Sequence, residues 1–163
     1  MTLVDYATYI AGLPRVLAGA AALFRDDEGR VLLVEPNYRE GWALPGGTVE
    51  SDAGETPRQG ARRETLEEIG LDVRLGRLLA VDWVPGTARP PLVAYLYDGG
   101  VLGAERIAAI RLQEEELLSW RFVARADLPA HLPGALGGRV LAALDALTAG
   151  TGPVELENGT PVA

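Results

Sequence analysis

Short apolar runs separated by glycine, proline and acidic residues characterise the first part of the chain and predict strands. Residues 16–24 are apolar and mostly small, which is typical of a strand buried on both faces. An acidic turn at 26–29 and a second apolar run at 31–34 then predict a hairpin. Further on, Asp98-Gly99-Gly100 is expected to turn the chain. The remaining strands are expected at 73–84, 92–97, 107–112 and 120–123.

The clearest helix signal lies in the middle of the chain. Thr56 is a favourable N-cap, Pro57 suits the first helical position, and Gln59 completes a capping box. A glycine at position 70 is typical of the left-handed residue that ends a helix. The sequence therefore predicts a helix over 56–69.

A second helix is predicted over 136–147, where four apolar residues recur at helical spacing. Strands interleaved with one central and one terminal helix indicate a layered α/β domain over 15–149. The first 14 residues are expected to form a short helix or arm. The glycine- and proline-containing residues 150–163 are expected to form a loose tail.

Composition narrows the function classes. The chain has 163 residues, enough for one domain, with 23 acidic and 15 basic residues and a formal net charge of −8. This balance argues against binding to nucleic acid or to anionic lipid, because both require a basic surface. Without cysteine, and with His131 as its single histidine, the chain has no thiolate nucleophile and no multi-histidine zinc site.

No signal peptide is recognisable, and the longest apolar run is too short to cross a bilayer, so a cytoplasmic protein is expected. Catalysis would then depend on carboxylates, hydroxyls, arginines or a hard metal ion.

Three glutamates share one face of the predicted central helix. At 100° per residue, Glu64, Glu67 and Glu68 fall within an arc of about 100°. Like charges at these spacings destabilise a helix by a few tenths of a kcal/mol per pair, which a bound Mg²⁺ would offset. The alternative is a solvated acidic face neutralised by Arg62 and Arg63. The adjoining arc is expected to pack on a sheet and contains Ala61, Thr65, Leu66 and Ile69.

The residues around these glutamates resemble the signature of the Nudix hydrolase superfamily, G-x5-E-x7-R-E-U-x-E-E-x-G-U, where U is a bulky aliphatic residue. Glu55 is followed by seven residues and then by the run RETLEEIGL at 63–71. Two positions depart from the signature. Seven residues instead of five separate Gly47 from Glu55, so the loop carries an insertion near 51–53, and Thr65 replaces an aliphatic residue.

The resemblance implies an α/β/α sandwich with a mixed central sheet and a catalytic helix at about 56–69. It implies that water attacks phosphorus in the diphosphate bond of a nucleoside diphosphate-linked substrate, with Mg²⁺ or Mn²⁺ as cofactor. Arg63 would hold a glutamate by an ion pair, and Glu55 would orient Arg63 or bind metal through water. The implied metal ligands are Glu64, Glu67, Glu68 and the backbone carbonyl of Gly46. The implied catalytic residues are Glu67, Glu68, Arg63 and Glu55.

A later acidic run offers candidates for the general base. In this family the base lies in the helix or in a later loop, and Glu114 and Glu116 lie in the run 114–116. The same run is also typical of a solvated turn.

Substrate contacts are harder to predict from the sequence. Arg25 and Arg39 could meet phosphates, and Trp42 could stack on a base, although aromatic residues in strands are more often part of the core. Pro85 lies in a segment that resembles the proline-containing loop of ADP-ribose-cleaving relatives.

Two alternatives to a nucleotide hydrolase stay open. One is a Nudix hydrolase that acts on an isoprenyl or sugar diphosphate. The other is a non-catalytic nucleotide-binding module on the same fold, which would not need three clustered carboxylates. The expected partner is a small-molecule diphosphate, and a homodimer is left open because relatives are often dimers.

Overall fold

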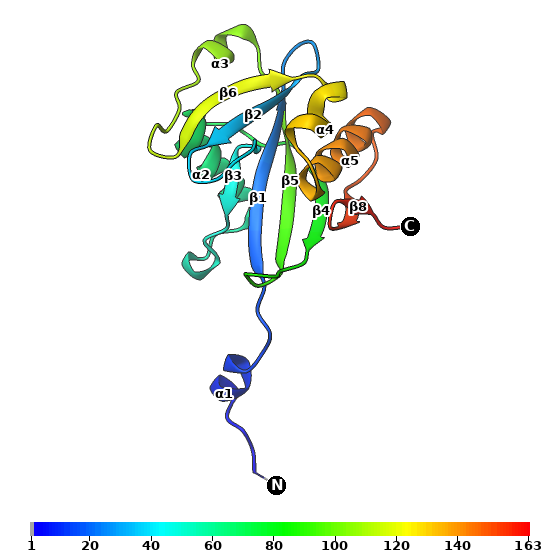
Figure 1. Cartoon of the computed structure of the whole chain (residues 1–163). Coiled ribbons are helices and arrows are strands. Elements are labelled where there is room, and N and C mark those ends of the chain that lie inside the picture. The colour runs from blue at the N-terminus through cyan, green and yellow to red at the C-terminus, as the bar shows by residue number, and fades with distance from the viewer. Residues whose placement is uncertain (1) are drawn as a thin grey trace.

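The computed structural model describes residues 2–163, which build an eight-stranded mixed sheet between two helical layers (Figure 1). The strand order is β6-β2-β1-β5-β4-β7-β8, and β3 pairs with β1 outside this path. β1 is parallel to β5, and β4 is parallel to β7, whereas the other pairs are antiparallel. The strands are β1 (Leu17–Arg25), β2 (Val31–Pro36), β3 (Gly46–Thr48), β4 (Leu78–Val84), β5 (Leu92–Val101), β6 (Leu117–Val123), β7 (Val154–Glu157) and β8 (Thr160–Pro161).

Helices cover both faces of the sheet. Helix α2 lies on one face, and α4 and α5 lie on the other (Figure 1). This order confirms the predicted α/β/α sandwich with a mixed central sheet. The helices are α1 (Tyr6–Ala11), α2 (Pro57–Ile69), α3 (Ala104–Ala108), α4 (Leu128–His131) and α5 (Ala135–Ala149), and short 3-10 turns occupy Ser51–Ala53 and Arg125–Asp127.

Strand β1 separates two hydrophobic cores, as the small-residue run predicted. Ala20, Ala22 and Phe24 pack toward α2, and Leu23 packs toward α5. Each fully buried Leu or Phe side chain stabilises the fold by roughly 1.5–3 kcal/mol. The partners on the α2 side include Ala61, Ile69 and Tyr97, and those on the α5 side include Leu79, Leu96, Val140 and Leu144.

Two predicted strand segments are wrong. Residues 73–75 precede β4 outside the sheet, although Val73 and Leu75 alternate with exposed residues as in a strand. Gly76 and Arg77 exchange backbone hydrogen bonds with Asp98 of β5 but are not part of a regular strand. The apolar side chains of Val73 and Leu75 cover the core beside α2, so burial produces the period of two without a pairing strand. Residues 107–112 belong to the end of α3 and to irregular backbone, with Ile110 buried in the same core.

The predicted turn at Asp98-Gly99-Gly100 is also wrong, because β5 continues through it to Val101. The pairing of β1 with β5 shifts register here, so that Asp98 faces Leu23 and Gly100 faces Phe24. A Cβ atom on Gly99 would lie 2.5 Å from the Phe24 ring. Gly99 therefore serves the close approach of an aromatic ring at a β-bulge rather than a reversal of the chain.

The C-terminal segment, predicted as a loose tail, instead extends the sheet. β7 pairs with the edge strand β4, β8 folds back on β7, and Leu156 is buried in the α5-side core. The turn between the two strands is fastened by the Gly159 N–H, which donates to the fully buried Asp82 on β4. Without β7, the backbone N–H and C=O groups along the edge of β4 would lack partners. The C-terminal residues supply these partners, which their glycine- and proline-containing composition did not indicate.

Helix α1 lies away from the rest of the domain, at the end of an extended segment that leads into β1 (Figure 1). Asp5 caps α1, and Tyr6 and Tyr9 are exposed. Among residues 2–163, none of the helices combines the length and the apolar character needed to span a membrane.

The turn between β1 and β2 generates a stability prediction. Asp26 is buried and accepts hydrogen bonds from the backbone N–H groups of Glu28 (3.0 Å) and Arg30 (2.8 Å) and from the Arg30 Nε (2.6 Å). We expect Asp26→Ala to lower the free energy of unfolding by about 2 kcal/mol, because the N–H groups lose their acceptor. Urea denaturation measures the change. Asp27→Ala, at an exposed neighbour, is the matched control, and an equal loss in both variants would contradict the explanation.

Candidate active site

Helix α2 begins and ends as the sequence predicted. The Thr56 side chain accepts from the Gln59 N–H, the Gln59 side chain accepts from the Thr56 N–H, and Gly70 ends the helix in the left-handed conformation. The inserted residues near 51–53 form a short 3-10 turn before the helix. The insertion is therefore absorbed in the loop, and the register of the glutamates on the helix is unaffected.

The face of α2 that contacts the sheet differs in one respect from the predicted face. Ala61, Thr65 and Ile69 are buried as expected, but Leu66 is 49% exposed, whereas Glu68 is only 5% exposed. Compared with the predicted orientation, the helix is rotated about its axis so that Glu68 faces the sheet and Leu66 faces solvent. The reason lies in the sheet: the Gly46 N–H of β3 donates a hydrogen bond of 2.9 Å to Glu68 Oε2.

Glycines in β3 allow the glutamates to lie directly on its backbone. A Cβ atom on Gly47 would lie 2.5 Å from Glu64 Oε1. A Cβ atom on Gly46 would lie 2.5 Å from the Ala20 carbonyl oxygen of β1. A side chain at either position would separate α2 from β3 or β3 from β1, so the Gly-Gly pair that precedes the helix serves close packing at the site.

Arg63 donates hydrogen bonds to three carboxylates and lies 3.8 Å from a fourth, that of Glu50. Its Nε and Nη2 atoms donate to the two Glu55 carboxylate oxygens at 2.6 and 3.0 Å. Its Nη1 donates to Glu64 Oε1 at 3.0 Å and to Glu67 Oε2 at 3.1 Å, and Nη2 also donates to the Thr48 carbonyl at 3.1 Å. Arg63 therefore ties the helix to the loop before it and to the end of β3.

The Glu55–Arg63 pair is strongly ionised in both members. Hydrogen bonds from Arg63 lower the pKa of the Glu55 carboxyl, and Glu55 is the main cause of the raised pKa of Arg63. Glu55 Oε1 also accepts from the Glu50 N–H at 3.0 Å. A Cβ atom on Gly60 would lie 2.8 Å from Glu55 Oε1, so the glycine makes room for this carboxylate.

A cleft of about 550 Å³ opens over β3 beside the helix. Its lining contains five carboxylates and no basic side chain among the described residues. The carboxylates belong to Glu50, Glu64, Glu68, Glu115 and Glu116, and the other lining residues are Asn37, Tyr38, Gly46, Gly47 and Thr48.

The pKa values of the two inner glutamates reflect this imbalance of charge. Burial raises the pKa of Glu68 to about 8, against a lowering contribution from the Gly46 N–H, and Glu64 and Glu116 raise it further. Burial also raises the pKa of Glu64, even though Arg63 opposes the shift. The site concentrates negative charge that the protein itself compensates only in part.

The segment 111–116 places two further glutamates at this cleft. Two backbone hydrogen bonds of 2.9 and 3.0 Å join it to the last turn of α2. At the end of β2, the Asn37 N–H donates to the Glu116 carbonyl (2.8 Å), and Asn37 Nδ2 donates to the Glu115 carbonyl (2.6 Å). Glu115 and Glu116 consequently line the cleft, whereas Glu114 does not.

The donor set of the cleft fits a partly hydrated cation rather than a preformed cage. Glu67 is held by Arg63, half exposed, and does not line the cleft. Among residues 2–163, no three His, Cys, Asp or Glu side chains already form a group that could hold a metal ion. Mg²⁺, however, uses one or two carboxylates and keeps several waters or substrate oxygens. Glu64 and Glu68 supply two carboxylates to the cleft, and Arg63 contacts one oxygen of Glu64 from outside it.

A smaller cavity of about 300 Å³ adjoins the cleft on the α5 side of β3. Tyr38, Gly46, Gly47 and Thr48 line both spaces. Arg39, predicted from the sequence, lines this cavity. Its remaining wall is mostly apolar and includes Ala21, Leu44, Leu92, Ala94, Leu96 and Leu136.

Three other predicted substrate contacts lie outside both spaces. Arg25 forms an ion pair of 3.3 Å with Asp98 near the far end of β1. Trp42 packs its edge against His131, and the Arg121 guanidinium lies 4.5 Å from the centroid of its ring. Pro85 is exposed in the loop between β4 and β5. The tertiary structure thus uses the first two in packing and places the third at the surface.

Sequence reasoning missed several residues at these spaces, among them Asn37, Tyr38, Glu50, Glu115 and Arg139. Asn37 and Tyr38 follow β2 in a polar loop, a position where functional residues are common, so that signal was available. Arg139 lines the smaller cavity from α5. Nothing in its local sequence distinguishes it from the other arginines.

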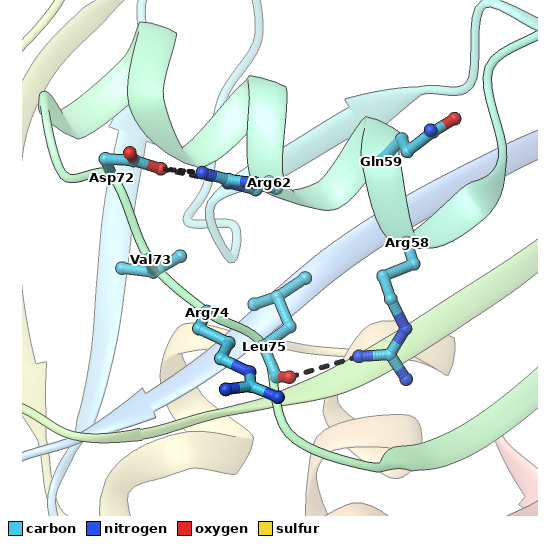
Figure 2. A pocket seen from close by; sticks show the side chains of 7 residues that line it. All are labelled: Arg58, Gln59, Arg62, Asp72, Val73, Arg74 and Leu75. Atoms are coloured by element: carbon cyan, nitrogen blue, oxygen red, sulfur yellow. Dashed lines mark hydrogen bonds and ion pairs between the residues drawn. The ribbon is translucent and has the colours of Figure 1, made fainter.

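A larger cavity of about 690 Å³ lies on the other side of α2 (Figure 2). Arg58 donates there to the Leu75 carbonyl at 3.1 Å, and Arg62 forms an ion pair of 2.8 Å with Asp72. Asp72 is the single carboxylate of its lining within the described chain. The lining of this larger cavity carries a net positive charge from Arg58, Arg62 and Arg74, whereas the glutamate cleft is negative. The largest of the three cavities is therefore not the acidic site.

Comparisons with known proteins agree with this arrangement. The NUDIX domain family matches residues 15–144. An RNA pyrophosphohydrolase of Roseobacter denitrificans is 31% identical over 122 residues, which are 66% of this chain and 75% of that protein. Diphosphoinositol polyphosphate phosphohydrolase 2 of Rattus norvegicus is 44% identical over 64 residues, which are 38% of this chain and 35% of the rat protein.

The fold is also that of solved relatives. The structure of a MutT NUDIX hydrolase from Burkholderia pseudomallei superimposes with a TM-score of 0.64 at 26% identity, covering 80% of this chain and 97% of that one. The family match spans most of the chain and includes the capped glutamate helix, the glycine pair and β1 to β6. The chain therefore belongs to the NUDIX domain family and is a Nudix diphosphate hydrolase.

Proposed function

We propose that the protein hydrolyses the diphosphate bond of a nucleoside diphosphate-linked small molecule with the help of Mg²⁺ or Mn²⁺. The observation that carries the proposal is the cleft with five carboxylates and no basic lining residue, which opens into a second, largely apolar cavity. Phosphate oxygens would be repelled from such a cleft unless cations were bound there, and Nudix hydrolases generally use divalent ions.

The residues proposed to hold the cation are Glu64 and Glu68, with the Gly46 carbonyl and Glu67 as further ligands. Glu64 and Glu68 line the cleft, which supports the first pair most directly. Glu67 would have to exchange its contact with Arg63 for the cation. A divalent cation bound here would neutralise charge on the diphosphate and lower the pKa of a water molecule.

The remaining catalytic work falls to side chains around the cleft. Glu116 is proposed to accept the proton of the attacking water, while the bridging oxygen leaves with the departing phosphoryl group. Its place over Glu64 and Glu68, held through Asn37, supports this role. Arg63 is proposed as a positioning residue, because it fixes Glu55 and Glu64 without lining the cleft.

The smaller cavity is the proposed place for the group attached to the diphosphate. It shares β3 residues with the cleft, so one molecule can reach from one space into the other. A nucleoside is favoured because the wall combines apolar side chains with Arg39 and Arg139, which suits a flat group that carries acceptor oxygens. The Roseobacter relative is named for RNA, itself built of nucleotides.

Hydrolysis by purified protein tests the function. We expect Mg²⁺- or Mn²⁺-dependent cleavage of at least one member of a panel of nucleoside triphosphates, ADP-ribose, NADH, dinucleoside polyphosphates, nucleotide sugars and isoprenyl diphosphates. Glu68→Gln should lower kcat at least 100-fold, since it removes a charged ligand. Glu105→Gln, an exposed glutamate on α3, is the control. Preference for an isoprenyl diphosphate would overturn the nucleoside assignment, and no metal-dependent turnover of any substrate would overturn the hydrolase assignment.

The identity of the base can be resolved by a matched pair of variants. We expect Glu116→Gln to lower kcat by about 100-fold, within the range of general base catalysis, with little change in KM. Glu114→Gln should leave kcat unchanged because Glu114 is exposed outside the cleft. Steady-state kinetics across pH 5–9 measures both. Equal losses in the two variants would assign the run 114–116 a structural role instead.

Thermal unfolding tests metal binding without relying on activity. In metal-free protein, the raised pKa of Glu68 means that the folded state holds the proton more tightly than the unfolded chain. The protonated Glu68 side chain therefore stabilises the folded state at acid pH. This stabilisation is lost as the pH rises from the ordinary glutamate pKa of 4.5 to the folded-state pKa of about 8. Glu68→Gln should therefore raise the Tm at pH 8 and leave it nearly unchanged at pH 4.

Addition of Mn²⁺ should raise the Tm of the wild-type protein by several degrees, because a ligand that binds only the folded state stabilises it, and should have less effect on Glu68→Gln. An equal metal-induced rise in both proteins would place the cation elsewhere.

A further inference from the structure

A buried ion pair stands at the back of the smaller cavity. Asp82 of β4 has no exposed surface, and Arg139 of α5 has a side chain that is 14% exposed. Arg139 Nε donates to Asp82 Oδ2 at 2.9 Å, and its Nη2 lies 2.9 Å from the same oxygen. The Gly159 N–H, in the turn between β7 and β8, lies 3.1 Å from each Asp82 oxygen. The carboxylate therefore fixes the guanidinium plane and is itself fixed by the C-terminal hairpin.

The pair is not needed merely to fill space. Removing two charges from water costs several kcal/mol, and apolar side chains of similar volume often stabilise a core as well or better. Neighbouring walls of the cavity are apolar, so such a replacement would suit its surroundings. The ion pair has a consequence that apolar residues would lack: it holds the guanidinium of a cavity-lining residue in a fixed position.

The free donor atoms of Arg139 can be identified. Nε and Nη2 face Asp82, and Nη1 has no hydrogen-bond partner among the described residues. Within residues 2–163, the one buried side-chain polar atom without a partner is Arg25 Nε, so Arg139 Nη1 is not buried. Arg139 lines the smaller cavity and keeps an N–H group that is neither buried nor paired, which makes it a candidate donor to a group bound there.

We infer that Arg139 is a specificity-determining residue, which donates hydrogen bonds to an acceptor oxygen or ring nitrogen on the group attached to the diphosphate. The inference rests on the proposed function, since the diphosphate at the glutamates sets which group reaches the cavity. A nucleobase carries such acceptors, and a hydrocarbon chain does not. Arg139 thereby selects a nucleoside over an isoprenyl group, and Asp82 positions it.

The test uses a variant that keeps the buried pair matched. Arg139→Gln alone would leave Asp82 as an unpaired buried charge and could prevent folding, so it is combined with Asp82→Asn. The control removes an exposed ion pair, Arg125 with Asp145 (2.8 Å), by Arg125→Gln with Asp145→Asn. Circular dichroism and Tm establish that both double variants are folded.

Two readouts separate the inference from the proposed function. With Mg²⁺ present, isothermal titration of nucleoside monophosphates, which have no diphosphate bond to hydrolyse, should give a Kd that is raised about tenfold or more in the Asp82→Asn, Arg139→Gln variant and unchanged in the control. In kinetics, KM for the best nucleotide substrate should rise similarly while kcat stays within about threefold, and inorganic pyrophosphate should be bound equally by all three proteins.

If the folded double variant has a lowered Tm but an unchanged Kd and KM, the inference is overturned. The Asp82–Arg139 pair would then serve only the stability of the fold. Absence of hydrolysis by the wild-type protein, together with a nucleotide Kd that depends on Arg139, would overturn the proposed function and support the inference. A variant that loses affinity for pyrophosphate to the same degree would also overturn it, because Arg139 would then act on the phosphates.

Discussion

The contact between Glu68 and the Gly46 N–H governs how α2 lies on the sheet, and the rest of the site depends on it. Burying a carboxylate is costly unless hydrogen bonds or a cation compensate it. One backbone donor compensates only part of this charge, so burial still raises the pKa of Glu68 to about 8. The molecule therefore retains a buried group that favours an added cation, at the expense of stability in its absence.

Arg63 compensates part of the acidic charge of this region. It pairs with Glu55, Glu64 and Glu67, which joins loop, helix and strand into one rigid unit. The adjoining cleft contains five carboxylates, of which Arg63 reaches Glu50 and Glu64, and no basic side chain lines it within the described residues. Much of the net charge of −8 thus lies where a divalent cation would be attracted, and the acidity of the chain is compatible with an anionic substrate.

Strand β3 borders both the glutamate cleft and the smaller cavity. Its glycines accept the glutamates on the α2 side, and its residues also border the smaller cavity toward α5. The C-terminal hairpin reaches that cavity through Asp82 and Arg139. In this arrangement the family motif supplies the glutamates of the cleft, whereas α5 and the C-terminal hairpin supply and support part of the wall of the smaller cavity.

The sequence by itself determined the capped helix 56–69, the doubly buried first strand and the set of glutamates on one helix face, because caps, periodicity and spacing are local. It failed where the outcome depended on a distant neighbour: Gly99 faces the Phe24 ring instead of turning the chain, and residues 150–163 find the open edge of β4. The tertiary structure alone decided the roll of α2 toward Glu68, the place of Glu116 over the cleft, and the removal of Arg25 and Trp42 from it. These choices follow from hydrogen bonds and packing between segments far apart in the chain, which no local pattern records.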